Sequence, residues 1–157
     1  MKRKYTLGAL AGIAALTFSV MSAQAELAKV TIVDDEKIQQ SLTGKEGDPM
    51  NGRKVAVNRR KGNCLACHVI SEIKDQQFHG QVGPPLDDVG SRMSAAEIRL
   101  RIVDPKVVNE DTIMPSFYRV DGFHRVMKKW QGKTIVSAQE VEDMIAYLMT
   151  LKGSYTK

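Results

Sequence analysis

The two cysteines of the chain lie three residues apart, and a histidine directly follows the second. They stand in the segment Cys64-Leu-Ala-Cys67-His68. Two thiols at this spacing on one helical turn reach the two vinyl groups along one edge of a haem, and the next imidazole then lies over the ring. The C-x-x-C-H pattern predicts covalent attachment of one haem through Cys64 and Cys67, with His68 as an axial iron ligand.

Three other interpretations of a cysteine pair at this spacing are less favoured. A thioredoxin-like redox pair follows a buried strand in a βαβ unit, whereas the segment before Cys64 is polar and basic. A zinc site needs a second pair of ligands, which His79 and His124 do not supply. A disulfide that closes so short a loop stabilises a protein little.

The second axial ligand decides whether the iron is closed to small molecules. The candidates after His68 are five methionines and two histidines: Met93, Met114, Met127, Met144, Met149, His79 and His124. Met93 and Met144 are expected to pack in the core, whereas Met114 lies in a non-helical segment stiffened by Pro115. Met114 is the predicted ligand, with His124 and Met127 as the alternatives. Two filled axial positions favour outer-sphere electron transfer, and a methionine ligand raises the reduction potential relative to two histidines.

A proline-rich turn follows the haem motif in the segment Gly83-Pro84-Pro85-Leu86. A ligating imidazole usually donates its other ring N–H to a carbonyl or carboxylate. Pro84, 16 residues after His68, offers such a carbonyl. An ordinary loop turn explains the same residues equally well.

The elements that position these residues are predicted to be all helical. Asp48 caps a helix with Pro49 at its first position, which is expected to run through Val57 to the cysteines. Capping boxes at 94–97 and 137–140 begin two more helices, the first ending near Val103 and the second near Gly153. The segment 30–33 is rich in β-branched residues and could form a short strand, and 69–92 reads as a loop.

The N-terminus carries Lys2, Arg3 and Lys4, then an apolar run, then Ala23-Gln-Ala25. This order predicts a signal peptide over residues 1–25 and export to the periplasm, because the apolar run is too short and too diluted to span a membrane. Its removal lowers the net charge from +5 to +2. The basic segment 53–61 is interpreted as a solvated helix face in preference to a docking patch. Aromatic residues make up 6% of the chain, so a buried haem would supply apolar bulk to the core.

The order of these motifs resembles class I cytochromes c. C-x-x-C-H, G-P-x-L, a Met-Pro loop and a terminal amphipathic helix follow one another along the chain. The resemblance implies an all-α class I cytochrome c fold over 49–157, preceded by an N-terminal extension over 26–48. It also implies that Pro84 accepts the hydrogen bond of His68 and that Met114 is the distal ligand.

More specifically, the mature chain is similar to the SoxX family, the mono-haem subunits of SoxAX complexes. The similarity lies in the segments 41–49, 62–68, 114–126 and 138–148. It implies a heterodimer with a SoxA-like haem subunit and transient contacts with a SoxYZ-like carrier and a downstream electron acceptor. The complex would join thiosulfate oxidatively to a carrier cysteine, and this chain would accept the electrons without being catalytic alone. Both of its cysteines are used for haem attachment, so no third thiol remains.

A free-standing periplasmic cytochrome c that shuttles electrons is the alternative function. The extension 26–48 argues against it, since a minimal carrier does not need one and a docking arm would explain it. Binding to nucleic acid is not indicated, because the mature chain has little net charge and lacks a Lys/Arg block.

Overall fold

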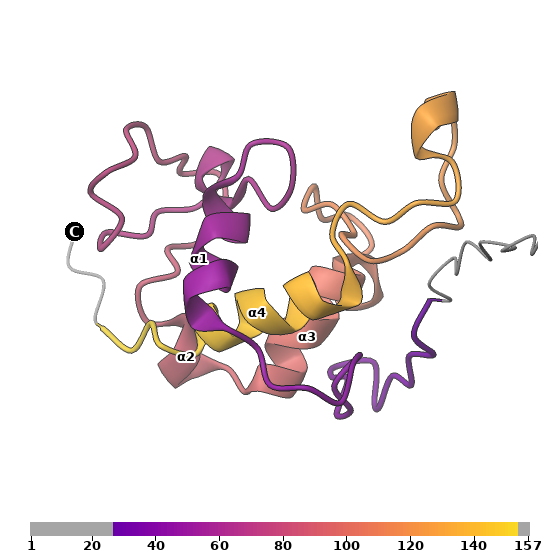
Figure 1. The fold of residues 1–157 in the computed structure, drawn as a ribbon, viewed down its shortest axis with the longest axis horizontal. Helices are drawn as coiled ribbons and strands as arrows, with labels where there is room; N and C mark the ends of the chain where they lie inside the picture. The colour runs from indigo at the N-terminus through magenta and orange to yellow at the C-terminus, as the bar shows by residue number, and fades with distance from the viewer. Residues whose placement is uncertain (1–26, 154–157) are drawn as a thin grey trace, which may run out of the picture.

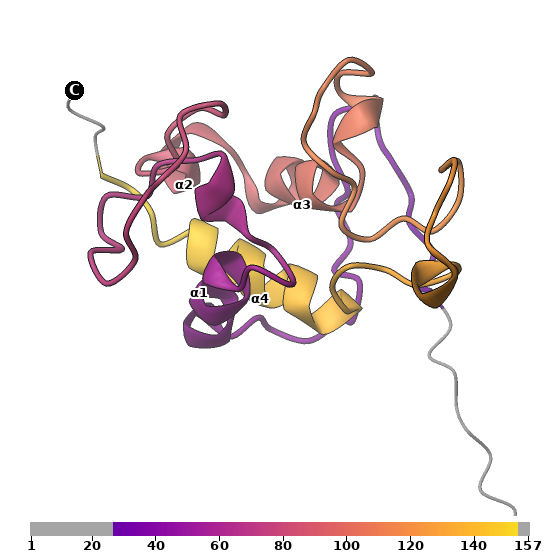
Figure 2. The ribbon, with the colours of Figure 1, turned by 90° about the horizontal axis from the view of Figure 1, so that it is seen from above.

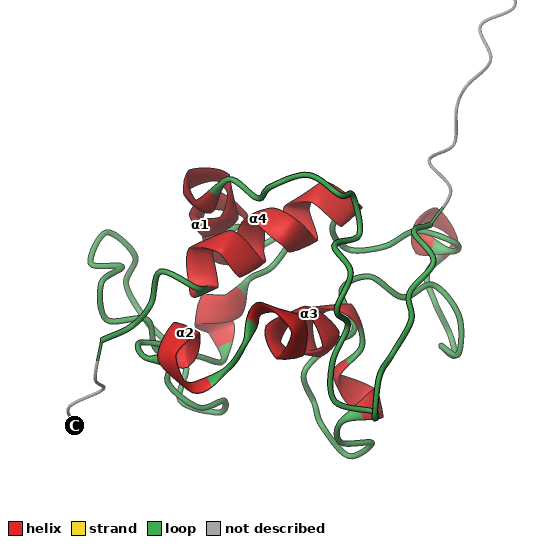
Figure 3. Cartoon of the chain, turned by 90° about the horizontal axis from the view of Figure 1, so that it is seen from below, coloured by secondary structure: helices red, strands yellow, loops and turns green. Residues whose placement is uncertain are grey.

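The computed structural model describes residues 27–153, which form a helical fold in which long loops connect short helices (Figures 1 and 3). The α-helices are α1 (Pro49–Val57), α2 (Val89–Arg92), α3 (Ala95–Val103) and α4 (Ala138–Leu148), and three 3-10 turns lie at Cys64–Ala66, Pro105–Val107 and Lys128–Trp130. Within this range no strand forms, and one isolated bridge joins Val33 to Lys37. The prediction of an all-α fold is therefore confirmed.

Helix α1 crosses α4 at close range, as Figures 1 and 2 show from two directions. A Cβ atom added at Gly52 would lie 1.9 Å from the carbonyl oxygen of Asp143, and one at Gly47 would lie 2.1 Å from that of Glu142. The two backbones therefore meet without intervening side chains. Next to this crossing, Val141 and Met144 of α4 are almost fully buried and form part of the core.

The carboxylate of Asp143 ties the start of α1 to α4. It accepts hydrogen bonds from the backbone N–H of Asp48 at 2.9 Å, from Nδ2 of Asn51 at 2.6 Å and from Nε2 of Gln139 at 3.0 Å. Burial tends to raise the pKa of this carboxyl, but the donors outweigh it and the pKa lies below its usual value. The ionised form of Asp143 therefore stabilises the fold.

Replacing this carboxylate tests its contribution directly. We expect Asp143→Asn to lower the free energy of unfolding at pH 7 by about 1–3 kcal/mol, because buried donors lose an acceptor. A depressed pKa stabilises the folded state above the unfolded-state pKa, and this stabilisation is lost as the pH falls through the folded-state pKa. The deficit should therefore shrink below about pH 4. Urea denaturation at pH 7 and pH 3 measures it. Asp35→Asn, at an exposed turn, is the control, and an equal deficit at both pH values would contradict the assignment.

The N-terminal extension packs onto α3 and α4 of its own chain. Ile38 is 1% exposed, and its carbonyl accepts a hydrogen bond from Nη1 of Arg99 at 2.8 Å. The same guanidinium forms a buried bidentate ion pair with Glu142, at 2.9 and 2.8 Å, and Glu142 also accepts from the N–H of Leu42. Because this packing uses the extension within the chain, a docking arm is not needed to explain it.

Several element boundaries differ from the sequence predictions. Helix α1 begins at Pro49 under an Asp48 cap as predicted, but it ends at Val57, and the prediction that it runs to the cysteines is wrong. The loop that follows turns at Asn63, which has φ 47°, so the haem motif starts on a separate 3-10 turn. Helix α2 was not predicted, and α4 ends at Leu148, before Gly153.

Both capping boxes are present and begin α3 and α4 where the sequence placed them. Segment 30–33 does not form a strand. Its only β-type pairing is the isolated bridge from Val33 to Lys37 across a tight turn. Residues 1–26 and 154–157 lie outside the described range, and so does the predicted signal peptide over residues 1–25. None of the helices from 27 to 153 is long and apolar enough to cross a membrane.

Candidate functional site

The cysteine motif lies on the wall of a cavity of about 680 Å³. A 3-10 turn over Cys64–Ala66 leads into it, and the N–H of His68 donates to the carbonyl of Cys64 at 2.9 Å. This tight turn brings the side chains of Cys64, Cys67 and His68 to the same cavity. Both cysteines are free, so their thiols are available for attachment.

The cavity is open to one side and mostly apolar, and its volume is typical of sites for small molecules and cofactors, roughly 300–1,000 Å³. Its walls come from the end of α1, from α3 and α4, and from the loops after His68 and before α4. The apolar residues of the wall include Leu86, Val89, Ile98, Ile102, Phe117, Met144 and Leu148. An apolar ring system with one exposed edge therefore fits the space.

The ring of His68 is held by the turn that the sequence singled out. Its Nδ1 lies 2.7 Å from the carbonyl oxygen of Pro84. A carbonyl only accepts hydrogen bonds, so Nδ1 carries the proton and Nε2 presents its lone pair. This is the tautomer that an iron ligand needs, with the carbonyl acting as the orienting partner of the imidazole.

Gly83 brings the backbone of the turn close to the imidazole. A Cβ atom added there would lie 2.3 Å from Cε1 and 2.6 Å from Nδ1 of His68. No side chain fits between this backbone and the ring, so Gly83 sets how near the Pro84 carbonyl can come. The sequence showed Gly83 as part of the turn but not this contact, because the contact depends on how the loop folds back.

We therefore expect Gly83→Ala to displace His68 and weaken its bond to Pro84. Overpacking of this kind costs about 1–3 kcal/mol of stability, and the loss of a well-oriented imidazole should alter the visible absorbance of the haem-loaded protein. Chemical denaturation and the absorption spectrum check the two effects. Gly153→Ala is the matched control, since its Cβ would meet only Asp87 O at 3.5 Å. Identical spectra and stabilities for the two variants would refute the positioning role.

Met114 also lines the cavity, on a loop fixed by its neighbours. Asp104, at the end of α3, accepts hydrogen bonds from Ser116 Oγ and from Arg119 Nη1, both at 2.7 Å. Burial tends to raise the pKa of Asp104, but these donors outweigh it and the pKa lies below its usual value. The N–H of Met114 donates to Oγ1 of Thr112 at 3.2 Å. The loop thus places Met114 in the cavity by contacts on both of its sides.

Of the other candidate ligands, some line the cavity and others do not. Met127 is 60% exposed, His124 is exposed, and neither lines the cavity. Nδ1 of His79 accepts from the N–H of Ile70 at 3.3 Å, outside the cavity wall. Met93 and Met144 do line the cavity, which the sequence did not show. Met144 is 2% exposed, so its packing agrees with the predicted core role.

The charges on the cavity wall all have one sign. Among the described residues that line it, four are cationic (Arg59, Lys61, Arg92 and Arg101) and none is acidic. Lys61 contacts Glu140, and Arg92 pairs with Asp88 at 2.7 Å. Arg59 and Arg101 have no described carboxylate within 4.0 Å. A mostly apolar cavity whose charged positions are all cationic fits a haem, which carries two carboxylates.

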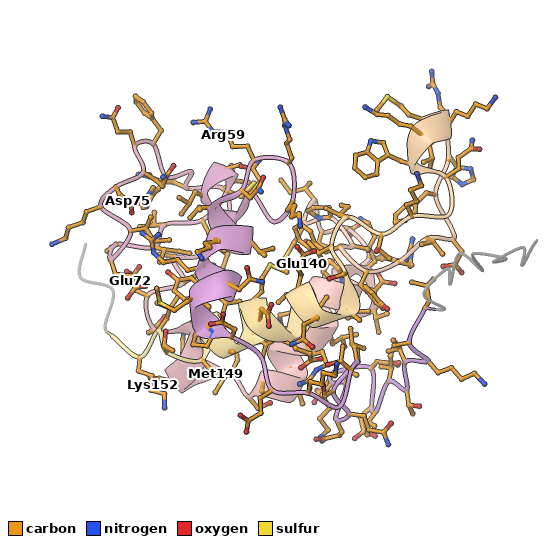
Figure 4. The ribbon with its side chains drawn as sticks, in the orientation of Figure 1. Arg59, Glu72, Asp75, Glu140, Met149 and Lys152 are labelled. Atoms are coloured by element: carbon orange, nitrogen blue, oxygen red, sulfur yellow. The ribbon has the colours of Figure 1, made fainter. Side chains whose placement is uncertain are left out.

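The sequence missed Arg101, because it lies within the apolar pattern of α3. It follows Ile98 by three residues and precedes Ile102, so helical spacing alone places it beside two cavity-lining residues. A cation at such a position is a usable signal for a bound anion. Arg59 was noted only as part of the basic segment 53–61, and its side chain lies at the loop after α1 (Figure 4).

No group of three or more His, Cys, Asp or Glu between residues 27 and 153 is arranged to hold a metal ion. The surroundings of Cys64 disfavour a thiol-disulfide exchange site. Burial raises the pKa of the Cys64 thiol to about 11. A thiol-disulfide exchange site needs a lowered cysteine pKa. The residues present therefore fit a haem, which Cys64, Cys67, His68 and Met114 would hold, and Arg59 and Arg101 would supply positive charge for its carboxylates.

Comparison with known proteins identifies the family of the chain. The sequence model of the cytochrome c family matches residues 49–152. The chain is 39% identical to a chain in the crystal structure of SoxXA from P. pantotrophus, with a TM-score of 0.73, and the match covers 79% of this chain and 95% of that one. The search of curated proteins gives no match.

The family supplies the cofactor that the cavity fits. Haem c is bound covalently, and its iron supplies one-electron transfer. Cys64, Cys67 and His68 would hold the group, Pro84 orients the His68 imidazole, and the apolar side chains of the cavity wall would cover the ring. The chain therefore belongs to the cytochrome c family, as a SoxX-like haem protein.

Proposed function

We propose that this chain is the electron-accepting mono-haem subunit of a periplasmic SoxAX-type complex. Its partner would be a SoxA-like haem subunit, and the complex would join thiosulfate to a cysteine of a SoxYZ-like carrier protein. The similarity to a chain of SoxXA supports the assignment. One observation carries the division of labour: both cysteines of the chain line the haem cavity, and the sequence contains no third thiol.

The proposed reaction forms one sulfur–sulfur bond. The outer sulfur of thiosulfate joins the sulfur of the carrier cysteine, the thiol loses its proton, and two electrons leave. A c-type haem accepts one electron at a time, so the two electrons pass through this chain in succession to a downstream electron acceptor. The chain contributes no thiol nucleophile to this step, since the sulfur atoms of Cys64 and Cys67 are used to attach the haem.

The purified haem-loaded chain should therefore be reducible by small donors but unable to conjugate thiosulfate by itself. Conjugation requires the partner, and replacing Met114 in the assembled complex should slow turnover without abolishing thiosulfate binding. The assay contains thiosulfate, carrier protein and an electron acceptor, with the chain alone or in complex. Robust conjugation by the lone chain would overturn the proposed role, as would unchanged turnover in the Met114 variant complex.

A free-standing electron shuttle is distinguished by co-purification. A tagged chain that is a subunit brings down an identified SoxA-like haem protein in fixed stoichiometry, whereas a shuttle elutes alone. The extension no longer separates the two functions, because it packs on α3 and α4 of its own chain. A chain that elutes alone from cells producing a SoxA-like protein would favour the shuttle.

A further inference from the structure

Residues 119–135 form an excursion between Tyr118 and α4 that stands apart from the helical body (Figures 1 and 2). No residue in this excursion is buried, and its only regular element is the 3-10 turn over Lys128–Trp130. The excursion returns to the body where the N–H of Ile135 donates to the carbonyl of Phe117 at 3.0 Å. Because the excursion contributes no buried side chain to the core, its side chains are accessible to another molecule.

Positive charge is concentrated on this excursion. It carries five cationic side chains, Arg119, Arg125, Lys128, Lys129 and Lys133, and one acidic side chain, Asp121, so its net charge is +4. Residues 26–157 together have a net charge of +2, so the rest of them is net negative by 2. The excursion is therefore one of two cationic segments of the chain, the other being 53–61 with five cations, and a cationic surface attracts an acidic one.

Large apolar side chains lie among these cations. Phe123 and Trp130 are each 42% exposed, and Met127 is 60% exposed. The Arg119 guanidinium lies 4.6 Å from the centre of the Phe123 ring, and Lys129 Nζ lies 5.8 Å from that of Trp130. Aromatic residues and arginine are enriched at protein interfaces, where a few of them supply most of the binding energy. The exposed side chains of the excursion have this composition.

A groove of about 470 Å³ leads from the excursion to the haem cavity. Phe123, Trp130 and Lys133 of the excursion line it, and so do Ile113, which is 77% exposed, and Asp111 from the loop after α3. Ile113, Met114 and Pro115 line both the groove and the haem cavity. A protein seated in this groove would lie beside the Met114 side of the haem site, at short range for electron transfer.

We propose that the excursion 119–135 and its groove form the docking surface for the haem-bearing partner subunit. The partner surface would be apolar at its centre, to receive Phe123 and Trp130, and acidic at its rim, to face the lysines. A stable subunit fits better than a transient electron acceptor, because exposed aromatic anchors beside a groove suit a desolvated interface. This inference rests on the proposed function, since it takes the SoxA-like subunit as the occupant.

The test measures the affinity of the haem-loaded chain for its SoxA-like subunit at low and high salt. Trp130→Ser should weaken binding by about tenfold or more, and Lys128→Glu with Lys129→Glu should weaken it mainly at low salt. Unchanged haem spectra show that each variant is folded. Lys54→Glu with Arg60→Glu is the matched control: it makes the same charge change at exposed positions on the basic segment 53–61, outside both cavities.

Each outcome decides between named possibilities. Failure of the wild-type chain to bind the SoxA-like subunit overturns the subunit role itself, and this inference with it. Wild-type binding that the excursion variants leave unchanged overturns the docking surface alone. A loss confined to the control pair assigns docking to the segment 53–61. Binding of the wild-type chain to phosphatidylserine vesicles that Trp130→Ser abolishes, with the protein complex intact, assigns the excursion to a membrane surface.

Discussion

Met114→Ala should open one axial position of the haem iron. Carbon monoxide and cyanide should then bind, the weak red absorption band of sulfur bound to iron should disappear, and the reduction potential should fall, because a methionine ligand favours the ferrous state. The wild-type protein should bind these ligands poorly. Visible spectroscopy with and without each ligand, and a redox titration, measure the three changes.

The expected size of this effect follows from the rigidity of the loop. Pro115 stiffens the backbone directly after Met114. Further along the same loop, Asp104 accepts hydrogen bonds from Ser116 and Arg119. A loop fixed in this way does not readily bring a second side chain to the vacated position. The open position of the variant should therefore be accessible to added ligands at neutral pH.

Two control variants separate Met114 from the other methionines. Met127→Ala should leave the band, the potential and the ligand binding unchanged, because Met127 is 60% exposed and lies outside the cavity. Met93→Leu is the stricter control, since Met93 lines the same cavity and Leu conserves its volume. If the Met93 variant loses the sulfur band and the Met114 variant keeps it, Met93 is the ligand.

Replacing both Cys64 and Cys67 by Ala should prevent stable accumulation of the protein. The free energy of unfolding of a domain is about 5–15 kcal/mol, and this chain has a cavity of about 680 Å³ that a haem would fill. Without covalent attachment, the unfolded chain releases the haem and the core loses its central apolar group. Each single variant keeps one thioether bond and should accumulate at an intermediate level.

The measurement is haem staining after denaturing electrophoresis, together with the yield of folded protein. The wild-type chain should stain, the single variants should stain more weakly, and the double variant should not stain. Ser71→Ala, an exposed change just after the haem motif, is the control for handling and export. A double variant that folds and keeps its haem through denaturation would contradict covalent attachment through these two residues.

The sequence by itself identified the haem motif and most of the helices, because both depend on local chemistry. The spacing of Cys64, Cys67 and His68 is enough to predict attachment, and the cofactor is now supported by the family and by the cavity. The capping boxes at Ser94 and Ser137 fixed the starts of α3 and α4, since each box is a set of hydrogen bonds within four residues.

Tertiary structure decided which distant residues share the cavity. Met93, Met114 and Met144 have similar side chains, and only the folded chain shows that all three line the haem site while Met127 does not. Helix α1 ends at Val57, where Asn58 is extended, and the following loop turns at Asn63, which has φ 47°. Arg59 and Arg101 line the same cavity although they lie 42 positions apart in the sequence.

The same distinction explains the surfaces. Both 53–61 and 119–135 are rich in cations in the sequence. The sequence does not show which of these cations form ion pairs, because their partners lie far away along the chain. In the fold, Arg53 pairs with Asp75 and Lys61 with Glu140, whereas Lys129 of the excursion lies 5.8 Å from the ring centre of the exposed Trp130. Local sequence therefore determined the cofactor and the helix starts, whereas packing between distant segments determined the ligand cavity and the exposed face, because those depend on long-range contacts.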